Sequence, residues 1–331
     1  MKVSADDNTR KVNKVMVEIG GYIEFEHYLL PMLHEKAVAL NCGRNCLAYL
    51  IEAKKIKKIS LPYFLCDSVI KLCKSYGIEI HYYHVNESFL PENILLDDDE
   101  WLYVVNYYGQ VSSSQILALQ KQFLRIIVDN AQAYFDMPVE GIDTLYTCRK
   151  FFGVPDGAFL YTDSLLERGI EQDESFERMH FLLGRYERKA SEFYDEYVNN
   201  NVLFESEPIK KMSKLTQNLL HSFDYNRIKK IRTDNYAYVS DKLGNRNLLN
   251  PKKVEGAFAY PLMLENGASI KKKLIEKKIY IPTLWPNVLE TLDASSLEYK
   301  LAEQIIPIPC DQRYGEEELE YVCTLIKGLE K

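Results

Sequence analysis

Three segments of this chain place polar side chains where an apolar, strand-like run gives way to a loop or a helix. The first is the turn CGRN at residues 42–45, which opens an amphipathic helical segment. Backbone N–H groups at a helix start attract anions, and Arg44 would add a full positive charge. The alternative is an ordinary glycine turn before a helix, with Asn45 as a possible helix cap.

The second segment is IIVDNAQAYF, in which Asp129 follows directly after a run of apolar residues. A carboxylate buried at that place needs a partner, because an unpaired buried charge is costly. The partner is either the start of a following helix or a cationic ring nitrogen of a bound cofactor.

The third segment is TCRKFFGVPDGAF, which places Lys150 in a loop between two short strand-like runs. A lysine in apolar surroundings loses its proton more readily, and the neutral amine attacks aldehydes. A solvated loop lysine is the alternative. Together, the turn, the aspartate and the lysine match the phosphate, ring nitrogen and aldehyde of pyridoxal 5'-phosphate (PLP). Open α/β sheets bind ligands at such strand ends.

The elements that must position these residues alternate along the chain. Strand-like runs at residues 58–62, 78–85, 101–109 and 124–132 are separated by helical segments at 67–77 and 112–123. Continuous apolar runs between helices are typical of a parallel sheet buried on both faces. We therefore predict an α/β fold with a mostly parallel sheet sandwiched by helices.

The pattern changes on both sides of this region. Residues 13–40 mix apolar and charged positions in a helix-like way, with a break at Pro31. Residues 165–240 are charged and helical, with both signs interspersed, as on a solvated or dimer-facing helix surface. We predict an N-terminal segment over residues 1–30, a large domain over 31–240 and a smaller α+β domain over 241–331.

The composition narrows the function classes. The 331 residues include 41 Lys and Arg against 48 Asp and Glu, a formal net charge of −7, which disfavours nucleic-acid binding. The sequence has no signal peptide and no apolar run of membrane-spanning length, and its seven cysteines are scattered. We therefore expect a reduced, cytoplasmic protein without membrane spans. Dinucleotide, nucleotide-triphosphate and metal-binding motifs are missing.

Several segments also resemble a known family. VDNAQAY followed by TCRKFFGVPDGAFLYT is similar to the aspartate and lysine segments of fold-type I PLP enzymes, most of all the DegT/StrS sugar aminotransferases. VNYYGQ resembles the strand end Val-His-x-Tyr-Gly of that family. Looser likeness covers residues 60–80 and 260–322, so the resemblance extends from about residue 40 to the C-terminus.

The resemblance implies a fold-type I homodimer that transfers an amino group from an amino acid to a keto sugar. We expect that sugar to be nucleotide-linked, as in polysaccharide biosynthesis. Lys150 would bind the cofactor aldehyde, Asp129 would pair with the ring nitrogen, and Gln132 would lie by the ring hydroxyl. The implied phosphate-binding residues are Gly43, Arg44, Asn45 and Thr147.

The sequence departs from the family pattern at three places, one of which is the loop before Lys150, which is shorter than usual. Cys66 stands where relatives have an aromatic side chain stacked on the cofactor ring, so Phe64 or Tyr63 would replace it or the ring would be held more loosely. The partner subunit's phosphate-binding asparagine has no match at Ile209. A PLP-dependent sugar dehydratase or lyase, whose members often carry histidine in place of the lysine, and a catalytically silent binding protein remain as alternatives.

Overall fold

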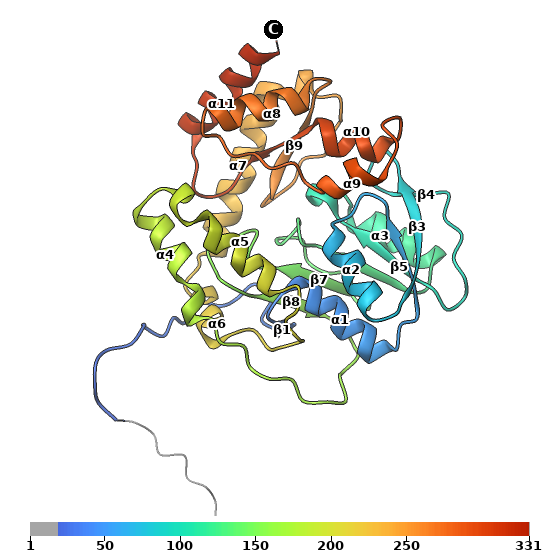
Figure 1. Cartoon of the computed structure of the whole chain (residues 1–331), viewed down its shortest axis with the longest axis vertical. Coiled ribbons are helices and arrows are strands. Elements are labelled where there is room, and N and C mark those ends of the chain that lie inside the picture. Colours follow the sequence, from blue (N-terminus) through green and yellow to red (C-terminus); the bar gives the residue numbers. More distant parts are fainter. Residues whose placement is uncertain (1–18, 331) are drawn as a thin grey trace, which may run out of the picture.

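An eight-stranded sheet forms the centre of the computed structural model, which describes residues 19–330 (Figure 1). Its strand order is β1-β8-β7-β6-β5-β2-β3-β4. The middle strands run parallel, namely β2 (Lys58–Pro62), β3 (Glu79–Val85), β5 (Trp101–Val105), β6 (Ile126–Asp129) and β7 (Asp143–Thr147). The remaining strands pair antiparallel, namely β1 (Val38–Leu40), β4 (Pro91–Glu92) and β8 (Ala158–Tyr161). The predicted mostly parallel sheet is confirmed.

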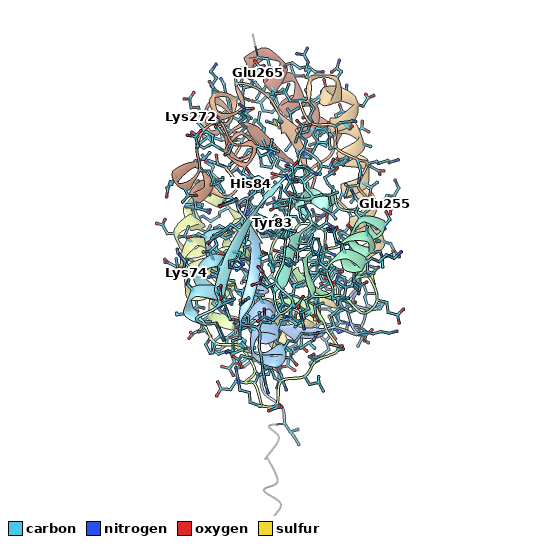
Figure 2. All side chains as sticks on the ribbon, turned by 90° about the vertical axis from the view of Figure 1, so that its right-hand side faces the viewer. Lys74, Tyr83, His84, Glu255, Glu265 and Lys272 are labelled. Carbon is cyan, nitrogen blue, oxygen red and sulfur yellow. The ribbon has the colours of Figure 1, made fainter. Side chains whose placement is uncertain are left out.

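Helices cover both faces of this sheet. Helices α1 (Gly43–Lys54) and α2 (Asp67–Ser75) pack against each other and against the sheet, and α3 (Ser113–Gln122) lies on the opposite face (Figure 2). The predicted serine-opened helix is α3, because the Ser112 hydroxyl accepts from the Gln115 N–H and the Gln115 side chain accepts from the Ser112 N–H. The buried strands between these helices account for the continuous apolar runs.

Most of residues 165–240 are helical, as predicted. They form α4 (His180–Glu187), α5 (Tyr194–Leu203), α6 (Lys214–Leu220), α7 (Tyr225–Leu243) and short 3-10 turns η2 (Phe176–Arg178) and η3 (Ala190–Phe193). Ile228 of α7 packs in an aromatic-rich core together with Tyr146 and Phe159 of the sheet, whereas Val239 packs in the C-terminal core. Helix α7 thus passes through the proposed boundary at residue 240, and the domain limits stay a prediction.

The C-terminal part is built on an antiparallel pair, β9 (Ala259–Met263) and β10 (Ile305–Pro309). It carries α8 (Gly267–Glu276), α9 (Pro286–Thr291), α10 (Leu297–Gln304) and α11 (Glu316–Leu329). Helix α10 contacts the large sheet, because Glu298 Oε1 lies 3.0 Å from His84 Nδ1 and accepts from the Val85 N–H at 2.9 Å. Figure 2 shows His84 at this junction.

The helix-like pattern predicted for residues 13–40 is wrong over residues 19–37, where the chain forms no helix. Gly20 and Gly21 have φ values of +91° and +98°, outside the right-handed helical region, and Pro31 follows. Residues 13–18 lie outside the described part of the chain. None of the helices within residues 19–330 is both long and apolar enough to cross a membrane.

Candidate active site

Most of the predicted site residues lie along one edge of the sheet, where the parallel strands end. They are Cys66 after β2, Asp129 and Gln132 at β6, and Thr147 and Lys150 at β7. Strand β1 pairs antiparallel with β8, and β8 pairs antiparallel with β7, so β1 ends at this edge too. It therefore delivers Gly43, the first residue of α1, to the same edge.

Asp129 is a buried carboxylate at the end of β6. Its Oδ2 accepts from the Tyr103 hydroxyl at 2.8 Å, and its Oδ1 accepts from the Ala131 N–H at 2.8 Å. Burial raises the pKa of Asp129, and the charge of Lys150 and these two hydrogen bonds partly offset that rise. Asp129 is followed by a turn and not by a helix, so it caps only the Ala131 N–H.

Tyr103 is a partner that the sequence analysis missed. It lies opposite Ile127 in the pairing of β5 with β6, so its side chain points to the same face as that of Asp129. The alternation of side chains along strands is the signal that could have identified it. Its buried hydroxyl fixes the carboxylate toward the strand-end edge.

Lys150 lies in the turn that follows β7, with an exposed side chain. Its Nζ is 5.8 Å from the centroid of the Phe258 ring, which comes from the C-terminal part of the chain. The positive charge of Lys150 lowers the pKa of Asp129. The predicted aspartate and lysine follow adjacent strands, because Asp129 of β6 pairs with Leu145 of β7.

The backbone next to Lys150 is held firmly. The Phe151 N–H donates to the Cys148 carbonyl at 2.9 Å. The Phe151 carbonyl accepts from Arg232 Nη2 at 3.0 Å and from Gln312 Nε2 at 2.9 Å. Since these donors come from α7 and from the loop after β10, tertiary contacts set the position of the lysine turn.

Gln132 connects two strand-end loops. Its Oε1 accepts from the Tyr108 N–H at 2.8 Å, which ties the loop after β6 to the 3-10 turn η1 (Tyr107–Gly109) after β5. Tyr108 has a φ of +53°, a left-handed conformation that costs energy in a residue with a side chain. Gln132 therefore lies beside Asp129 and stabilises the neighbouring turn.

The start of α1 lies against the end of β7. A Cβ added at Gly43 would be 3.8 Å from the Thr147 Cβ, so the two backbones run side by side. Cys42 is the N-cap of α1 and makes no side-chain cap hydrogen bond, which leaves the N–H groups of Gly43 and Arg44 for other acceptors. This turn has the donors that an anion requires.

Asn45 does not cap this helix, so that expectation is wrong. It is the third residue of α1, and its Nδ2 donates to the Asn41 Oδ1 at 2.8 Å and to the Pro208 carbonyl at 2.7 Å. Its backbone N–H donates to the Cys42 carbonyl at 3.1 Å. The geometry thus gives Asn45 a structural role and no support for phosphate binding.

The start of α1 and the ends of β6 and β7 are neighbours. Gly43 lies against Thr147 of β7, and Asp129 of β6 pairs with Leu145, two residues before Thr147. The residues predicted for the phosphate, the ring nitrogen and the aldehyde therefore follow neighbouring elements at this edge of the sheet.

The residues proposed to stack on a cofactor ring have other neighbours. Cys66 is the half-buried N-cap of α2, with its Sγ 3.1 Å from the Ser68 Oγ. The buried Phe64 ring lies 4.4 Å from the Trp285 ring, and the Tyr63 ring lies 5.1 Å from that of Tyr82. Both aromatic rings are thus already packed against other side chains.

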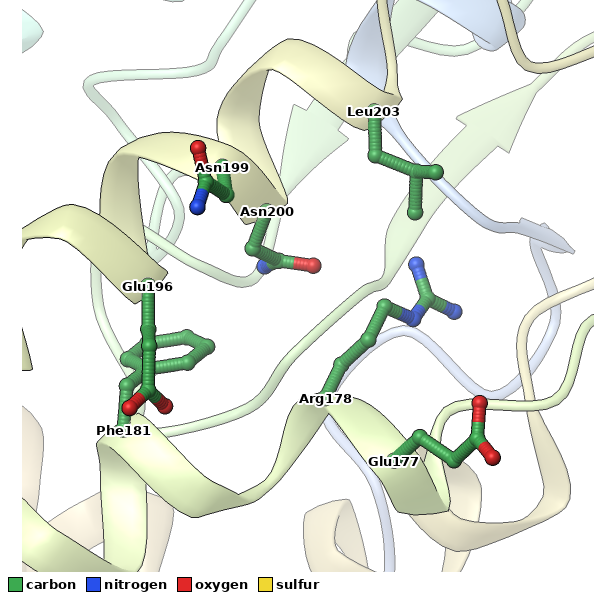
Figure 3. Close-up of a pocket in the computed structure, with 7 residues that line it drawn as sticks. All are labelled: Glu177, Arg178, Phe181, Glu196, Asn199, Asn200 and Leu203. Carbon is green, nitrogen blue, oxygen red and sulfur yellow. The ribbon is translucent and has the colours of Figure 1, made fainter.

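A separate pocket of about 260 Å³ lies between η2, α4 and α5 (Figure 3). Arg178 Nη1 and Asn200 Oδ1 border it and have no hydrogen-bond partner among residues 19–330. None of the residues predicted for PLP lines this pocket. It adjoins the loop after Lys150, since Asn200 Nδ2 donates to the Pro155 carbonyl at 2.9 Å.

Comparison of the sequence with models of protein families gives no match, and comparison with curated proteins gives none either. Solved structures with a similar fold include the sugar aminotransferase CalS13 from Micromonospora echinospora, with a TM-score of 0.59 and 14% identity over 88% of this chain and 87% of that one. A DegT DnrJ EryC1 StrS aminotransferase from Brucella abortus has a TM-score of 0.56 and 13% identity over 88% and 85% of the two chains.

The E. coli GDP-4-keto-6-deoxy-D-mannose-3-dehydratase with bound hydrated PLP is similar to the same degree. Its TM-score is 0.57 and its identity is 13%, over 87% of each chain. The chain therefore has the fold of these proteins, and the predicted fold-type I architecture is confirmed.

Proposed function

We propose that this protein is a PLP-dependent aminotransferase of the DegT/StrS type that transfers an amino group from an amino acid to a keto sugar. The observation that carries the proposal is the placement of the buried Asp129 and of Lys150 after the adjacent strands β6 and β7, beside the start of α1. The chain shares its fold with sugar aminotransferases and with a PLP-bound dehydratase.

The residues present fit PLP. The carboxyl of Asp129 is buried and its pKa is raised, so a cationic ring nitrogen beside it would restore the charged form. The start of α1 offers uncapped N–H groups next to Gly43 and the Thr147 hydroxyl for a phosphate. Lys150 supplies an exposed primary amine for the aldehyde.

Each side chain then has a defined part in the transfer. When bound, PLP supplies an electron sink for the carbanion formed at the amino-bearing carbon. Lys150 Nζ would bind the aldehyde carbon until the substrate amine displaces it, and would then carry a proton between the substrate and cofactor carbons. Asp129 would hold the proton on the ring nitrogen, and Tyr103 would keep the carboxylate in position.

Replacement of Lys150 by alanine tests this proposal. We expect the wild-type protein to bind PLP with a change in its absorbance spectrum, and borohydride to attach the cofactor covalently at Lys150. Lys150→Ala should lose the covalent product and keep its circular dichroism spectrum. Lys272→Ala, on an exposed position of α8, is the matched control and should behave as wild type. Covalent attachment in Lys150→Ala equal to that in the control would refute the role of Lys150.

The similarity to a dehydratase favours one further candidate, a PLP-dependent sugar dehydratase or lyase. Incubation of the PLP-loaded protein with glutamate separates the two reactions. An aminotransferase releases 2-oxoglutarate and accumulates the pyridoxamine form of the cofactor, whereas a dehydratase that takes no amino group from glutamate does not. If the wild-type protein binds no PLP, the protein is a silent binding protein on the same fold.

We also propose that the protein is a cytoplasmic homodimer with nucleotide-linked sugars as substrates. Large apolar side chains near the N-terminus support the dimer, because Ile19, Tyr22 and Ile23 are more than nine-tenths exposed in the single chain. Sedimentation equilibrium measures the oligomeric state, and a monomer at micromolar concentration would contradict this part of the proposal.

A further inference from the structure

Residues 19–25 form an extended arm whose apolar side chains are open to water. Ile19, Tyr22 and Ile23 are 96–97% exposed. The arm contains no helix or strand and leaves the body of the molecule near α6 (Figure 1). Several large apolar side chains gathered in one exposed segment are typical of a surface that packs against a partner.

The base of the arm is fixed on α6. The Tyr28 N–H donates to the Asn218 Oδ1 at 2.9 Å, and the Asn218 Nδ2 donates to the Glu26 carbonyl at 2.8 Å. The Leu30 N–H donates to the His221 carbonyl at 3.0 Å. The arm therefore starts at a defined point, from which its seven residues can reach about 23–25 Å when extended.

A second exposed apolar surface lies on α4 and α5, and we call it the α4–α5 face. It consists of Leu183 and Tyr186 of α4, which are 53% and 93% exposed, and Tyr194 at the start of α5, which is 61% exposed. The buried Phe193 ring lies directly against Gly184 of α4. A packed pair of helices thus presents this face.

The two surfaces stand out from the rest of the molecule. More than half of the large apolar side chains that are exposed within residues 19–330 lie in residues 19–30 and 176–203. The others are spread over the rest of the sequence, as on most protein surfaces. Two such surfaces on one chain fit contact between two copies, because an exchange about a two-fold axis buries each surface in both copies.

The charges of the two surfaces are complementary. Residues 19–30 contain two Glu and no Lys or Arg, whereas residues 180–189 contain three Lys or Arg and one Glu. Arg185 and Lys189 are exposed and form no ion pair with the described carboxylates, while the third cation, Arg188, is already paired. Opposite charges on two surfaces favour their association and orient it.

We propose that the arm of one copy docks on the α4–α5 face of a second copy, which docks its own arm in the same way. Burial of Ile19, Tyr22, Ile23 and Phe25 would remove about 300–600 Å² per arm from water. Both arms and the surfaces that they cover come to about 1,200–2,400 Å², which matches the size of stable interfaces, about 1,200–2,000 Å². The inference rests on the homodimer proposed above and names the elements that form it.

Charge reversal tests this contact, with sedimentation equilibrium as the measurement. The arm variant carries Glu24→Lys and Glu26→Lys, and the face variant carries Arg185→Glu and Lys189→Glu. We expect the dissociation constant of each variant to rise about 10- to 100-fold, because like charges then meet at both contacts. An equimolar mixture of the two variants should form dimers of nearly wild-type affinity, since both contacts of the mixed dimer carry opposite charges.

Removal of apolar side chains gives a second measurement. The double variant Tyr22→Ser, Ile23→Ser should raise the dissociation constant at least about 100-fold, because both arms lose their buried area. The matched control is the double variant Tyr321→Ser, Leu95→Ser, which removes side chains that are 55% and 96% exposed outside both surfaces and should dimerise as the wild type does. Thermal unfolding shows whether each variant keeps its fold.

Three results would overturn the inference. If the arm and face variants dimerise as the wild type does, or if their mixture restores no dimer, the homodimer forms through another surface. If the variants lower the melting temperature of a monomer and leave association unchanged, the arm packs on the α4–α5 face of its own chain. A monomeric wild type overturns the homodimer and the inference together. Borohydride trapping of PLP at Lys150 in the same samples reports separately on the proposed aminotransferase.

Discussion

Replacement of Arg232 by methionine tests whether the C-terminal part holds the lysine turn in place. Arg232 of α7 is only 1% exposed and joins three segments. Its Nε donates to the Gln312 Oε1 at 2.8 Å, its Nη1 to the Ala257 carbonyl at 2.9 Å and its Nη2 to the Phe151 carbonyl at 3.0 Å. The Phe151 ring also lies 4.6 Å from the guanidinium.

The expected loss of stability follows from two opposing terms. Hydrogen bonds from a charged group contribute about 1.5–3 kcal/mol each, so removal of these interactions costs about 5–9 kcal/mol. Burial lowers the pKa of Arg232 from its ordinary value to about 10, and methionine recovers that desolvation, which is about 3 kcal/mol. We therefore expect Arg232→Met to lower the free energy of unfolding by about 2–6 kcal/mol.

Urea unfolding followed by circular dichroism measures this change. Arg168→Met is the matched control, because Arg168 is 51% exposed in its pair with Glu52 and should contribute less than about 1 kcal/mol. Borohydride trapping of PLP at Lys150 gives a second readout, and Arg232→Met should be trapped more slowly than the control. If Arg232→Met were as stable as Arg168→Met, the reasoning on buried guanidinium hydrogen bonds would be refuted.

Two further predictions concern buried titratable groups. Asp129→Asn should lower PLP affinity by at least about 10-fold, because the charge beside the ring nitrogen is lost, without lowering the melting temperature; a lower melting temperature with unchanged affinity would contradict this. Burial lowers the pKa of His34 to about 4, so protons bind more strongly to its unfolded form, of pKa 6.5. The contribution of His34 to stability is complete above pH 6.5 and is lost as the pH falls to 4, by about 3 kcal/mol. Unfolding free energies from pH 7 to pH 4 should fall more steeply for wild type than for His34→Gln; parallel curves would count against it.

The sequence alone located the strand ends and the residues that follow them. Continuous apolar runs predict buried parallel strands, and Asp129 and Lys150 stand next to such runs, so their place at one edge of the sheet follows from local pattern and topology. The glycine turn at the start of α1 could be identified in the same way, because a helix start has a local signature.

Tertiary structure decided which partners those residues meet. The Asn45 side chain donates to the Pro208 carbonyl, and the Arg149 guanidinium donates to the Asn201 side chain. Each partner is more than fifty positions away along the chain. Such partners depend on how α5 and its following loop pack over α1, and no local periodicity encodes that packing. The sequence therefore determined where the candidate site residues lie relative to the strands. Tertiary contacts determined which partners surround their charged groups, because the energy of a buried charge depends on every group that surrounds it.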